Sequence, residues 1–170
     1  LPSLYHPTHG RIARVGSRLV VALECQQRGP VWSKTTPDIE SGTAIWRESG
    51  VEIFFGPSTS TDGASNPPFA QYIVNARGAF AAFGVAKGQR ENVEVAVREL
   101  PEEQGYVIEA AFPLKTRNYD FRSNSTLSFN IMRNVYREDS YQADEIIGWA
   151  PIVKSARMAE SRGLLLTKPE

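Results

Sequence analysis

Residues 46–57 read Trp46-Arg-Glu-Ser-Gly-Val-Glu-Ile-Phe-Phe-Gly-Pro57, an apolar run with an aromatic residue before it and a carboxylate inside it. In an extended strand, Val51, Ile53 and Phe55 project to one face, and Glu52 projects to the other. A carboxylate inside such a run costs free energy unless neighbouring groups donate hydrogen bonds to it. The segment therefore predicts a strand with one buried face, and hydrogen-bond donors for Glu52 on the other.

The same two-residue alternation recurs along the chain, punctuated by Gly, Pro, Asn and Asp. No window of a dozen residues keeps a 3.6-residue period, so we expect at most one helical turn, near 115–120 or 155–160. The pattern predicts an all-β fold, a mostly antiparallel two-sheet sandwich of the jelly-roll or immunoglobulin-like kind, made by residues 1–170 as one domain. The expected strands are 18–26, 50–56, 69–76, 79–84, 92–99, 105–113, 126–136, 145–150 and 162–167.

Amide side chains share one face of the predicted strands with Glu52. They are Gln71, Asn75, Asn130 and Asn134. Because Asn and Gln are depleted in strands, their presence asks for an explanation. They form either one solvated face of a sandwich, or a polar floor that offers donors and acceptors to a polyhydroxylated ligand. Flat aromatic rings would complete the second arrangement, at about 1 kcal/mol for each ring contact beyond its buried area.

Four segments in order resemble the family 9 carbohydrate-binding modules and their relatives, which include β-sandwiches of the DOMON type. The first is the Trp46…Val-Glu-Ile-Phe55 strand, and the second is Gln71-Tyr-Ile-Val-Asn-Ala-Arg-Gly78. The others are Gly105-Tyr-Val-Ile-Glu-Ala-Ala-Phe-Pro-Leu114 and Leu127-Ser-Phe-Asn-Ile-Met-Arg133. The resemblance implies a non-catalytic module that binds a poly- or oligosaccharide, in some members at its terminal sugar.

The resemblance also implies a set of binding residues. Two tryptophans, Trp46 and Trp149, would stack on the sugar, and Glu52 and Arg77 would bind its hydroxyls; Gln71, Asn75 and Asn130 are lesser candidates. Relatives commonly carry an acidic pair where this chain has Ser49-Gly50, so we expect the loop around Trp46 to be arranged differently. Characterised members hold calcium, but no dense cluster of oxygen ligands indicates a calcium site here, and no other cofactor or metal is expected.

The amino-acid composition argues against some classes of binding partner. Nineteen basic and nineteen acidic residues cancel, which argues against a general nucleic-acid surface. No segment approaches the roughly 20 apolar residues of a membrane helix, so membrane insertion is not expected. The chain shows no signal peptide, and secretion or cell-surface attachment is expected from the resemblance alone, which leaves open an appended catalytic domain in a longer precursor. The single cysteine, Cys25, is expected to be a small buried hydrophobe.

Rival functions have weaker support in the residues. His6 and His9 lack the spacing of a helical metal pair, and no nucleophile or phosphate-loop motif occurs. Glu52 and Glu109 are the carboxylates that a glycosidase reading would pair across a cleft. A haem-binding electron-transfer domain of similar fold would use Met132 or Met158 as an iron ligand. A structural or interaction sandwich that has lost its sugar site is the remaining alternative.

Overall fold

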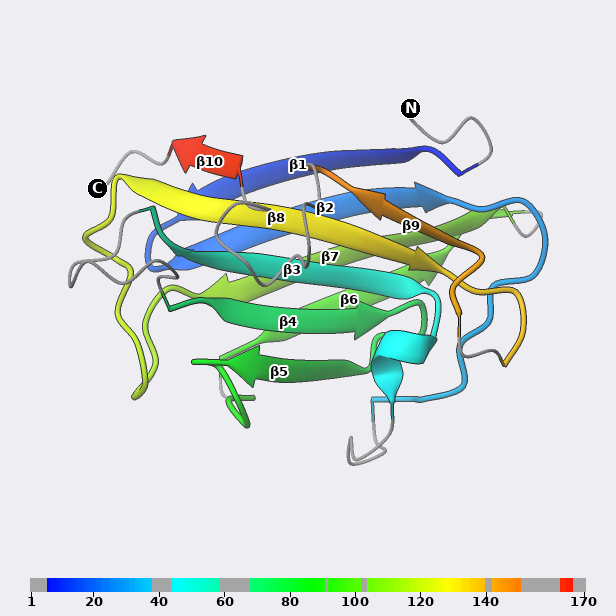
Figure 1. The fold of residues 1–170 in the computed structure, drawn as a ribbon, viewed down its shortest axis with the longest axis horizontal. Helices are drawn as coiled ribbons and strands as arrows, with labels where there is room; N and C mark the ends of the chain where they lie inside the picture. Colours follow the sequence, from blue (N-terminus) through cyan, green and yellow to red (C-terminus); the bar gives the residue numbers. More distant parts are fainter. Residues whose placement is uncertain are drawn as a thin grey trace.

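A computed structural model of the chain describes residues 6–37, 44–58, 68–90, 92–101, 104–139 and 142–150, together with the backbone of strand 163–166. Two antiparallel sheets lie face to face (Figure 1). This confirms the predicted all-β sandwich. Within the described residues, no helix is long and apolar enough to cross a membrane.

The four-stranded sheet has the order β1-β2-β7-β6. Its strands are β1 (Thr8–Val15), β2 (Arg18–Gln26), β6 (Glu94–Glu99) and β7 (Gly105–Pro113). The six-stranded sheet has the order β10-β8-β3-β4-β5, and β9 also pairs with β8. Its strands are β3 (Gly50–Pro57), β4 (Ala70–Asn75), β5 (Phe80–Gly84), β8 (Thr126–Val135), β9 (Glu145–Gly148) and β10 (Gly163–Leu166).

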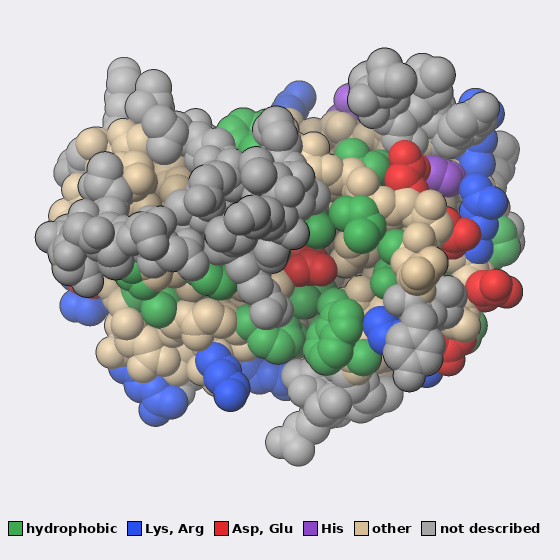
Figure 2. Space-filling view, viewed as in Figure 1, with side chains coloured by type: hydrophobic (Ala, Val, Ile, Leu, Met, Phe, Trp, Pro, Cys, Tyr) green, Lys and Arg blue, Asp and Glu red, His purple; other side chains and the backbone are tan. Residues whose placement is uncertain are grey.

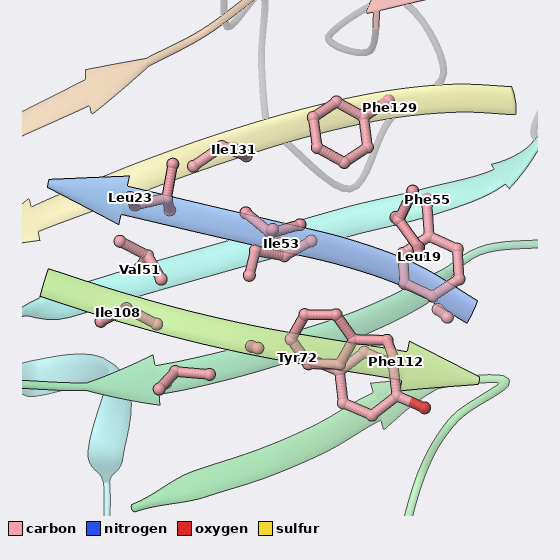
Figure 3. Packing of buried hydrophobic residues seen from close by; sticks show 14 of the residues in the cluster. Leu19, Leu23, Val51, Ile53, Phe55, Tyr72, Ile108, Phe112, Phe129 and Ile131 are labelled. Carbon is pink, nitrogen blue, oxygen red and sulfur yellow. The ribbon is translucent and has the colours of Figure 1, made fainter. Parts of the chain in front are cut away.

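The core fills the space between the sheets, and the alternating residues supply it. Val51, Ile53 and Phe55 are fully buried there, as the pattern of β3 predicts. Tyr72 of β4 stacks between Phe55 and Phe112, with ring centroids 6.0 and 4.6 Å away (Figure 3). Since aromatic pairs gain free energy beyond the area they bury, this column fastens the two sheets together.

Strand β1 and the helical segments differ from the prediction. Residues 8–15 were not expected to form a strand, because they are mostly polar or exposed. Along the full length of β1, they pair with residues 18–25 of β2. Residues 115–120 form a turn closed by a bridge between Lys115 and Asp120 instead of a helical turn, and 155–160 lie outside the described residues. A short 3-10 helix, η1 (Ile45–Arg47), precedes β3 instead.

Arg133 connects the start of the chain to β8. Its guanidinium donates from Nη1 to the carbonyls of His6 and Pro7 and to Thr8 Oγ1, and from Nη2 to the carbonyl of Gln26. The side chain is almost wholly buried, and each of these bonds reaches across more than 100 residues of sequence. A cation buried this deeply is tolerated because carbonyl and hydroxyl oxygens replace its hydration.

Candidate functional site

The outer face of the six-stranded sheet carries the predicted polar residues. Glu52 of β3 projects away from the core, as the burial of its neighbours Val51 and Ile53 requires. In the sheet register it lies opposite Ile73 of β4 on one side and Met132 of β8 on the other. The polar face is therefore a mixture of carboxylate, amide and apolar side chains.

Two buried amides hold the Glu52 carboxylate. Gln71 donates from Nε2 to Oε2 over 2.7 Å, and Asn134 donates from Nδ2 to Oε1 over 2.9 Å. Their side chains are only 1% and 4% exposed, whereas Glu52 itself is half-buried. A carboxylate has about four acceptor positions, so each oxygen keeps room for a further donor. These donors are the partners that the β3 pattern demanded, and they fix two acceptor oxygens at the surface.

Helix η1 places Trp46 against Phe83 of β5, which pairs with Gln71, the residue that donates to this carboxylate. Ile45 is fully buried in one cluster with Ile73, the cross-strand neighbour of Glu52, and with Ala79 and Ala81 at the start of β5. Because Ile45 anchors the turn, the next residue projects outward, and Trp46 is 46% exposed. Its ring meets Phe83 edge-on at a centroid distance of 6.2 Å. An exposed ring of fixed orientation thus stands over the same outer face.

Other apolar side chains extend this surface. Met132 is half-buried opposite Glu52, and Ile146 of β9, paired with Asn134, is 55% exposed. Figure 2 shows hydrophobic side chains on either side of an acidic one near the middle of the face. We call the surface of Trp46, Glu52, Phe83, Met132 and Ile146 the Trp46 face. It combines apolar contact area with fixed hydrogen-bond acceptors.

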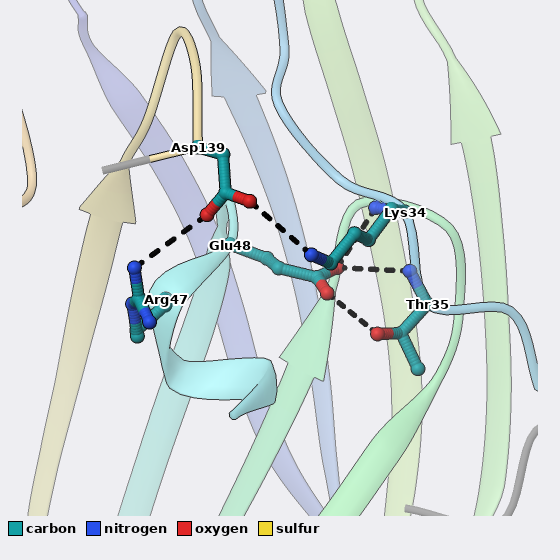
Figure 4. Close-up of polar contacts among 5 residues, drawn as sticks. All are labelled: Lys34, Thr35, Arg47, Glu48 and Asp139. Carbon is teal, nitrogen blue, oxygen red and sulfur yellow. Dashed lines mark hydrogen bonds and ion pairs between the residues drawn. The ribbon is translucent and has the colours of Figure 1, made fainter. Parts of the chain in front are cut away.

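Glu48 fastens the loop that lies next to η1. Its carboxylate accepts hydrogen bonds from the amides of Lys34 and Thr35 and from the Thr35 hydroxyl (Figure 4). It also accepts hydrogen bonds from the side chains of Ser33 and Asn75. Burial by itself would raise the pKa of the Glu48 carboxyl, but the hydrogen bonds from Thr35, Asn75 and Ser33 outweigh it and hold that pKa below its ordinary value. The sequence prediction missed this residue, although an acidic side chain directly before a buried strand was visible.

Asp139 adds two ion pairs at the surface of the same loop. Its carboxylate lies 3.3 Å from Lys34 Nζ and 3.5 Å from Arg47 Nη2 (Figure 4). Exposed pairs of this kind contribute little to stability. The buried Glu48 carboxylate, not Asp139, is therefore the anchor that fixes residues 33–35 beside η1.

Asn75 and Asn130 bind the protein's own chain. Asn75 donates to Thr35 O and to Glu48, and its Oδ1 accepts from the amides of Arg77 and Ala79. Asn130 Oδ1 accepts from the amide of Ala150 over 3.0 Å. Both side chains are fully buried. Of the predicted amides, Gln71 and Asn134 contact Glu52, whereas Asn75 and Asn130 hold the neighbouring loops.

Trp149 and Arg77 stand apart from the Trp46 face. Trp149 packs edge-on against the core residue Phe129, with ring centroids 5.5 Å apart, and it lines a separate hollow beside β1 together with Leu23. Arg77 is exposed at the β4–β5 turn and lines a hollow of about 450 Å³ with Glu99 and Tyr106. The structure thus puts Trp46, Glu52 and Gln71 on one face, connected through Phe83, and it directs the second tryptophan and the arginine to other hollows.

The residues of the rival functions are also placed. Glu109 is exposed on β7, so it and Glu52 project from opposite outer faces of the sandwich and cannot flank one bond. His6 is buried beside Arg133, and desolvation lowers its pKa. Among the described residues, no group of three or more His, Cys, Asp or Glu side chains could hold a metal ion. Met158 lies outside the described residues.

Solved structures with the same fold include a family 9 carbohydrate-binding module from Caldicellulosiruptor kristjanssonii, determined with glucose and with cellotriose. It is 16% identical, and the match covers 99% of this chain and 80% and 78% of the two solved chains, each with a TM-score of 0.71. A Bacteroides uniformis protein described as carbohydrate-binding matches with 14% identity, 96% and 79% coverage and a TM-score of 0.66. At these identities the likeness establishes the fold.

No match was found among curated proteins. A comparison with models of protein families, in contrast, establishes more than the fold. The model described as "Carbohydrate family 9 binding domain-like" matches residues 33–157, which is most of the chain. That segment includes η1, β3, β4, β5, β8 and β9, the elements that build the Trp46 face. The chain therefore belongs to the carbohydrate family 9 binding domain-like family.

Proposed function

We propose that the Trp46 face binds carbohydrate, as a non-catalytic module that recognises a poly- or oligosaccharide. The observation that carries the proposal is an exposed indole, Trp46, on the same face as a carboxylate whose two oxygens are held by buried amides. A pyranose ring has apolar faces of C–H groups and a rim of hydroxyls. An indole fits the first, and oriented acceptor oxygens fit the second.

Preorganisation supports this assignment. Ile45 anchors η1, and Glu48 fixes the adjoining loop, so Trp46 loses little freedom when a ligand arrives. Gln71 and Asn134 likewise fix the carboxylate before binding. Groups held in place pay less ordering entropy on association, so their contacts contribute more fully to affinity.

The solved relatives support the same ligand class. The Caldicellulosiruptor kristjanssonii module was determined with glucose and with cellotriose. Glucose is a single sugar and cellotriose a short chain, and an open face such as this one accommodates either. We propose that the module engages the terminal sugar of its ligand through Trp46 and Glu52.

The central experiment is a titration of cello-oligosaccharides against wild-type protein and Trp46→Ala, followed by calorimetry. Loss of the stacked ring removes about 1.4 kcal/mol or more, so we expect at least a tenfold weaker affinity. Trp149→Ala is the matched control, because Trp149 is 54% exposed but its ring packs against Phe129 and lines the hollow beside β1. We expect it to bind within twofold of wild type.

Each outcome has a meaning for the site. If Trp46→Ala binds as well as wild type, the Trp46 face is not the sugar site. If Trp149→Ala weakens binding equally, the two-tryptophan arrangement predicted from the resemblance is the correct one. If neither wild type nor variant binds glucans, xylans or mannans, the alternative of a structural or interaction sandwich without a sugar site replaces the proposal. Comparing free with reduced sugar ends tests the terminal-sugar assignment.

Glu52→Gln tests the polar half of the site. The substitution keeps the shape but replaces one acceptor oxygen by an NH₂ group, which faces the donor amides of Gln71 or Asn134. A hydrogen bond to a charged acceptor contributes about 1.5–3 kcal/mol, so we expect affinity to fall by one to two orders of magnitude. An unchanged circular dichroism spectrum would separate lost binding from lost folding, and unchanged affinity would remove Glu52 from the site.

A further inference from the structure

The structure contains a basic hollow at the edge of the sandwich next to β5. It has a volume of about 430 Å³ and lies between the connection that follows β5 and the turn that follows β7. Its lining residues are Gly88, Gln89, Arg90, Asn92, Lys115, Thr116 and Arg117. We propose that this basic hollow binds the acidic groups, carboxylate or sulfate, of a polysaccharide whose neutral portion occupies the Trp46 face.

Three cations surround the hollow, and its described lining has no acidic residue. The nearby carboxylate of Asp120 is engaged: Arg122 donates to it from Nε over 2.9 Å and from Nη2 over 2.7 Å, and Lys115 Nζ lies 3.7 Å away. These hydrogen bonds from Arg122 lower the pKa of Asp120, so the carboxylate stays charged and committed to its partners. Bringing like charges together costs free energy, and a bound anion removes that cost.

Both walls of the hollow are anchored to the core. On one side, Ala86 is fully buried, and successive turns from Phe83 to Gln89 are closed by backbone hydrogen bonds of 2.8–3.1 Å. Arg90 is held over the Phe80 ring at 5.4 Å from its centroid, with Nη2 donating to Phe80 O over 3.4 Å. The cation is therefore positioned before any ligand arrives.

The opposite wall is equally fixed. Tyr119 is buried, and its hydroxyl donates to Pro113 O over 2.7 Å. Thr116 donates its amide to Tyr119 O over 2.8 Å, which closes the turn that carries Lys115 and Arg117. Arg117 itself is exposed at the tip of this turn. An anion entering the hollow would thus meet charges from two rigid segments.

The basic hollow is close enough to the Trp46 face to share one ligand. Phe83, the ring that Trp46 contacts, lies only five residues before Gly88, so their Cα atoms are separated by at most about 18 Å of extended chain. Figure 2 shows basic side chains along the lower edge of the face, the edge that β5 occupies in Figure 1, with hydrophobic side chains above them. A chain of a few sugars could lie over both.

This inference rests on the proposed function for the neutral part of the ligand, and its test separates the two. The probes are cellohexaose, hexagalacturonate and a sulfated cellohexaose, each titrated at low and high salt. Wild type is compared with Arg117→Glu and with Arg11→Glu, a control that makes the same charge change at an exposed position on β1. We expect one or both acidic probes to bind at least fivefold more tightly than cellohexaose at low salt, with the advantage lost at high salt.

Arg117→Glu should abolish that advantage and leave cellohexaose affinity unchanged, while Arg11→Glu changes neither by more than twofold. Galacturonate and sulfated probes distinguish carboxylate from sulfate recognition. The inference is overturned if acidic and neutral probes bind alike, or if both charge variants weaken acidic probes equally. Equal Arg117-dependent binding of a single-stranded oligonucleotide would also overturn the polysaccharide assignment. If acidic probes bind through Arg117 but cellohexaose does not bind at all, the proposed function of the Trp46 face is wrong, while the basic hollow remains an anion-binding site.

Discussion

At the scale of single residues, Glu48 matters most for the shape of the candidate site. It is 3% exposed, and its oxygens satisfy donors from three consecutive residues of the 33–35 segment as well as Asn75. A buried donor that loses its acceptor costs its full desolvation free energy. The position of the loop beside η1 therefore depends on one carboxylate.

We predict that Glu48→Gln lowers the free energy of unfolding by about 2–3 kcal/mol, because at least one buried donor is left unpaired. Urea denaturation followed by circular dichroism measures the loss. Glu94→Gln is the control, since Glu94 pairs with Arg18 at the surface with its side chain 71% exposed, and exposed pairs contribute at most about 1 kcal/mol. Equal losses in the two variants would contradict the role assigned to Glu48.

The same residue gives a pH dependence with a definite sign. Because the pKa of Glu48 in the folded protein is below its ordinary value of 4.5, its carboxylate contributes stability that is present above pH 4.5 and is lost as the pH falls through the folded-state pKa. The stability difference between wild type and Glu48→Gln should therefore be largest near neutral pH and shrink below pH 4.5. A difference that stays constant down to the acid transition would refute this assignment.

At the scale of elements, β3 is the centre of the six-stranded sheet. It pairs with β4 on one side and β8 on the other, and both partners run antiparallel to it. Gly50 begins the strand where the backbone of β4 crosses closely: a Cβ at this position would lie 2.5 Å from Val74 O and 2.8 Å from Asn75 Cα. Gly50 is thus required by the close approach of two backbones.

We predict that Gly50→Ala destabilises the protein by about 1–3 kcal/mol, because the neighbouring backbone must shift to admit the methyl group. Gly10→Ala on β1 is a matched control: there the added Cβ meets mainly the flexible end of the Leu23 side chain, which can rotate away. Thermal unfolding of both variants tests the contrast. If the two variants are destabilised equally, the loss of stability does not come from the close approach of the backbones at Gly50, but from an effect common to both strand glycines.

At the scale of the whole molecule, the two sheets share one core, and Cys25 lies inside it. The side chain is fully buried on β2, a strand paired on both edges, and burial raises the pKa of the thiol to about 11. A thiol of this kind reacts as thiolate only when the surrounding structure opens. Since the Cys25 side chain lies in the core between the sheets, that opening requires the sheets to separate.

We predict that iodoacetamide at pH 8 labels Cys25 at least about a thousandfold more slowly in the folded protein than in urea, because only the small transiently opened population reacts. Labelling across a urea series should follow the loss of tryptophan fluorescence and circular dichroism. Rapid labelling without urea would mean that β2 opens locally, and the single shared core would then not be a cooperative unit.

Several features follow from local pattern alone. Alternating apolar residues predicted β2, β3, β7 and the buried side of each, because a strand exposes its side chains to two faces in strict turn. The run Val51-Glu-Ile-Phe-Phe55 also required donors for Glu52, and the structure supplies them from Gln71 and Asn134. Strand β1 escaped prediction because an exposed edge strand carries little apolar alternation.

The sequence by itself determined the fold class, the core residues and the position of Trp46 next to a strand with Glu52, since each depends on neighbours in the chain. Only the tertiary structure decided which distant residues meet: Glu48 with the 33–35 loop, Trp149 with Phe129, and Arg90 with Lys115 and Arg117 around one hollow. The hollow could not be predicted from a run of basic residues, because its charges come from two connections that strand pairing brings together. Such contacts are set by the topology of the sheets and not by spacing along the sequence. The affinity of a site for its ligand depends on these contacts.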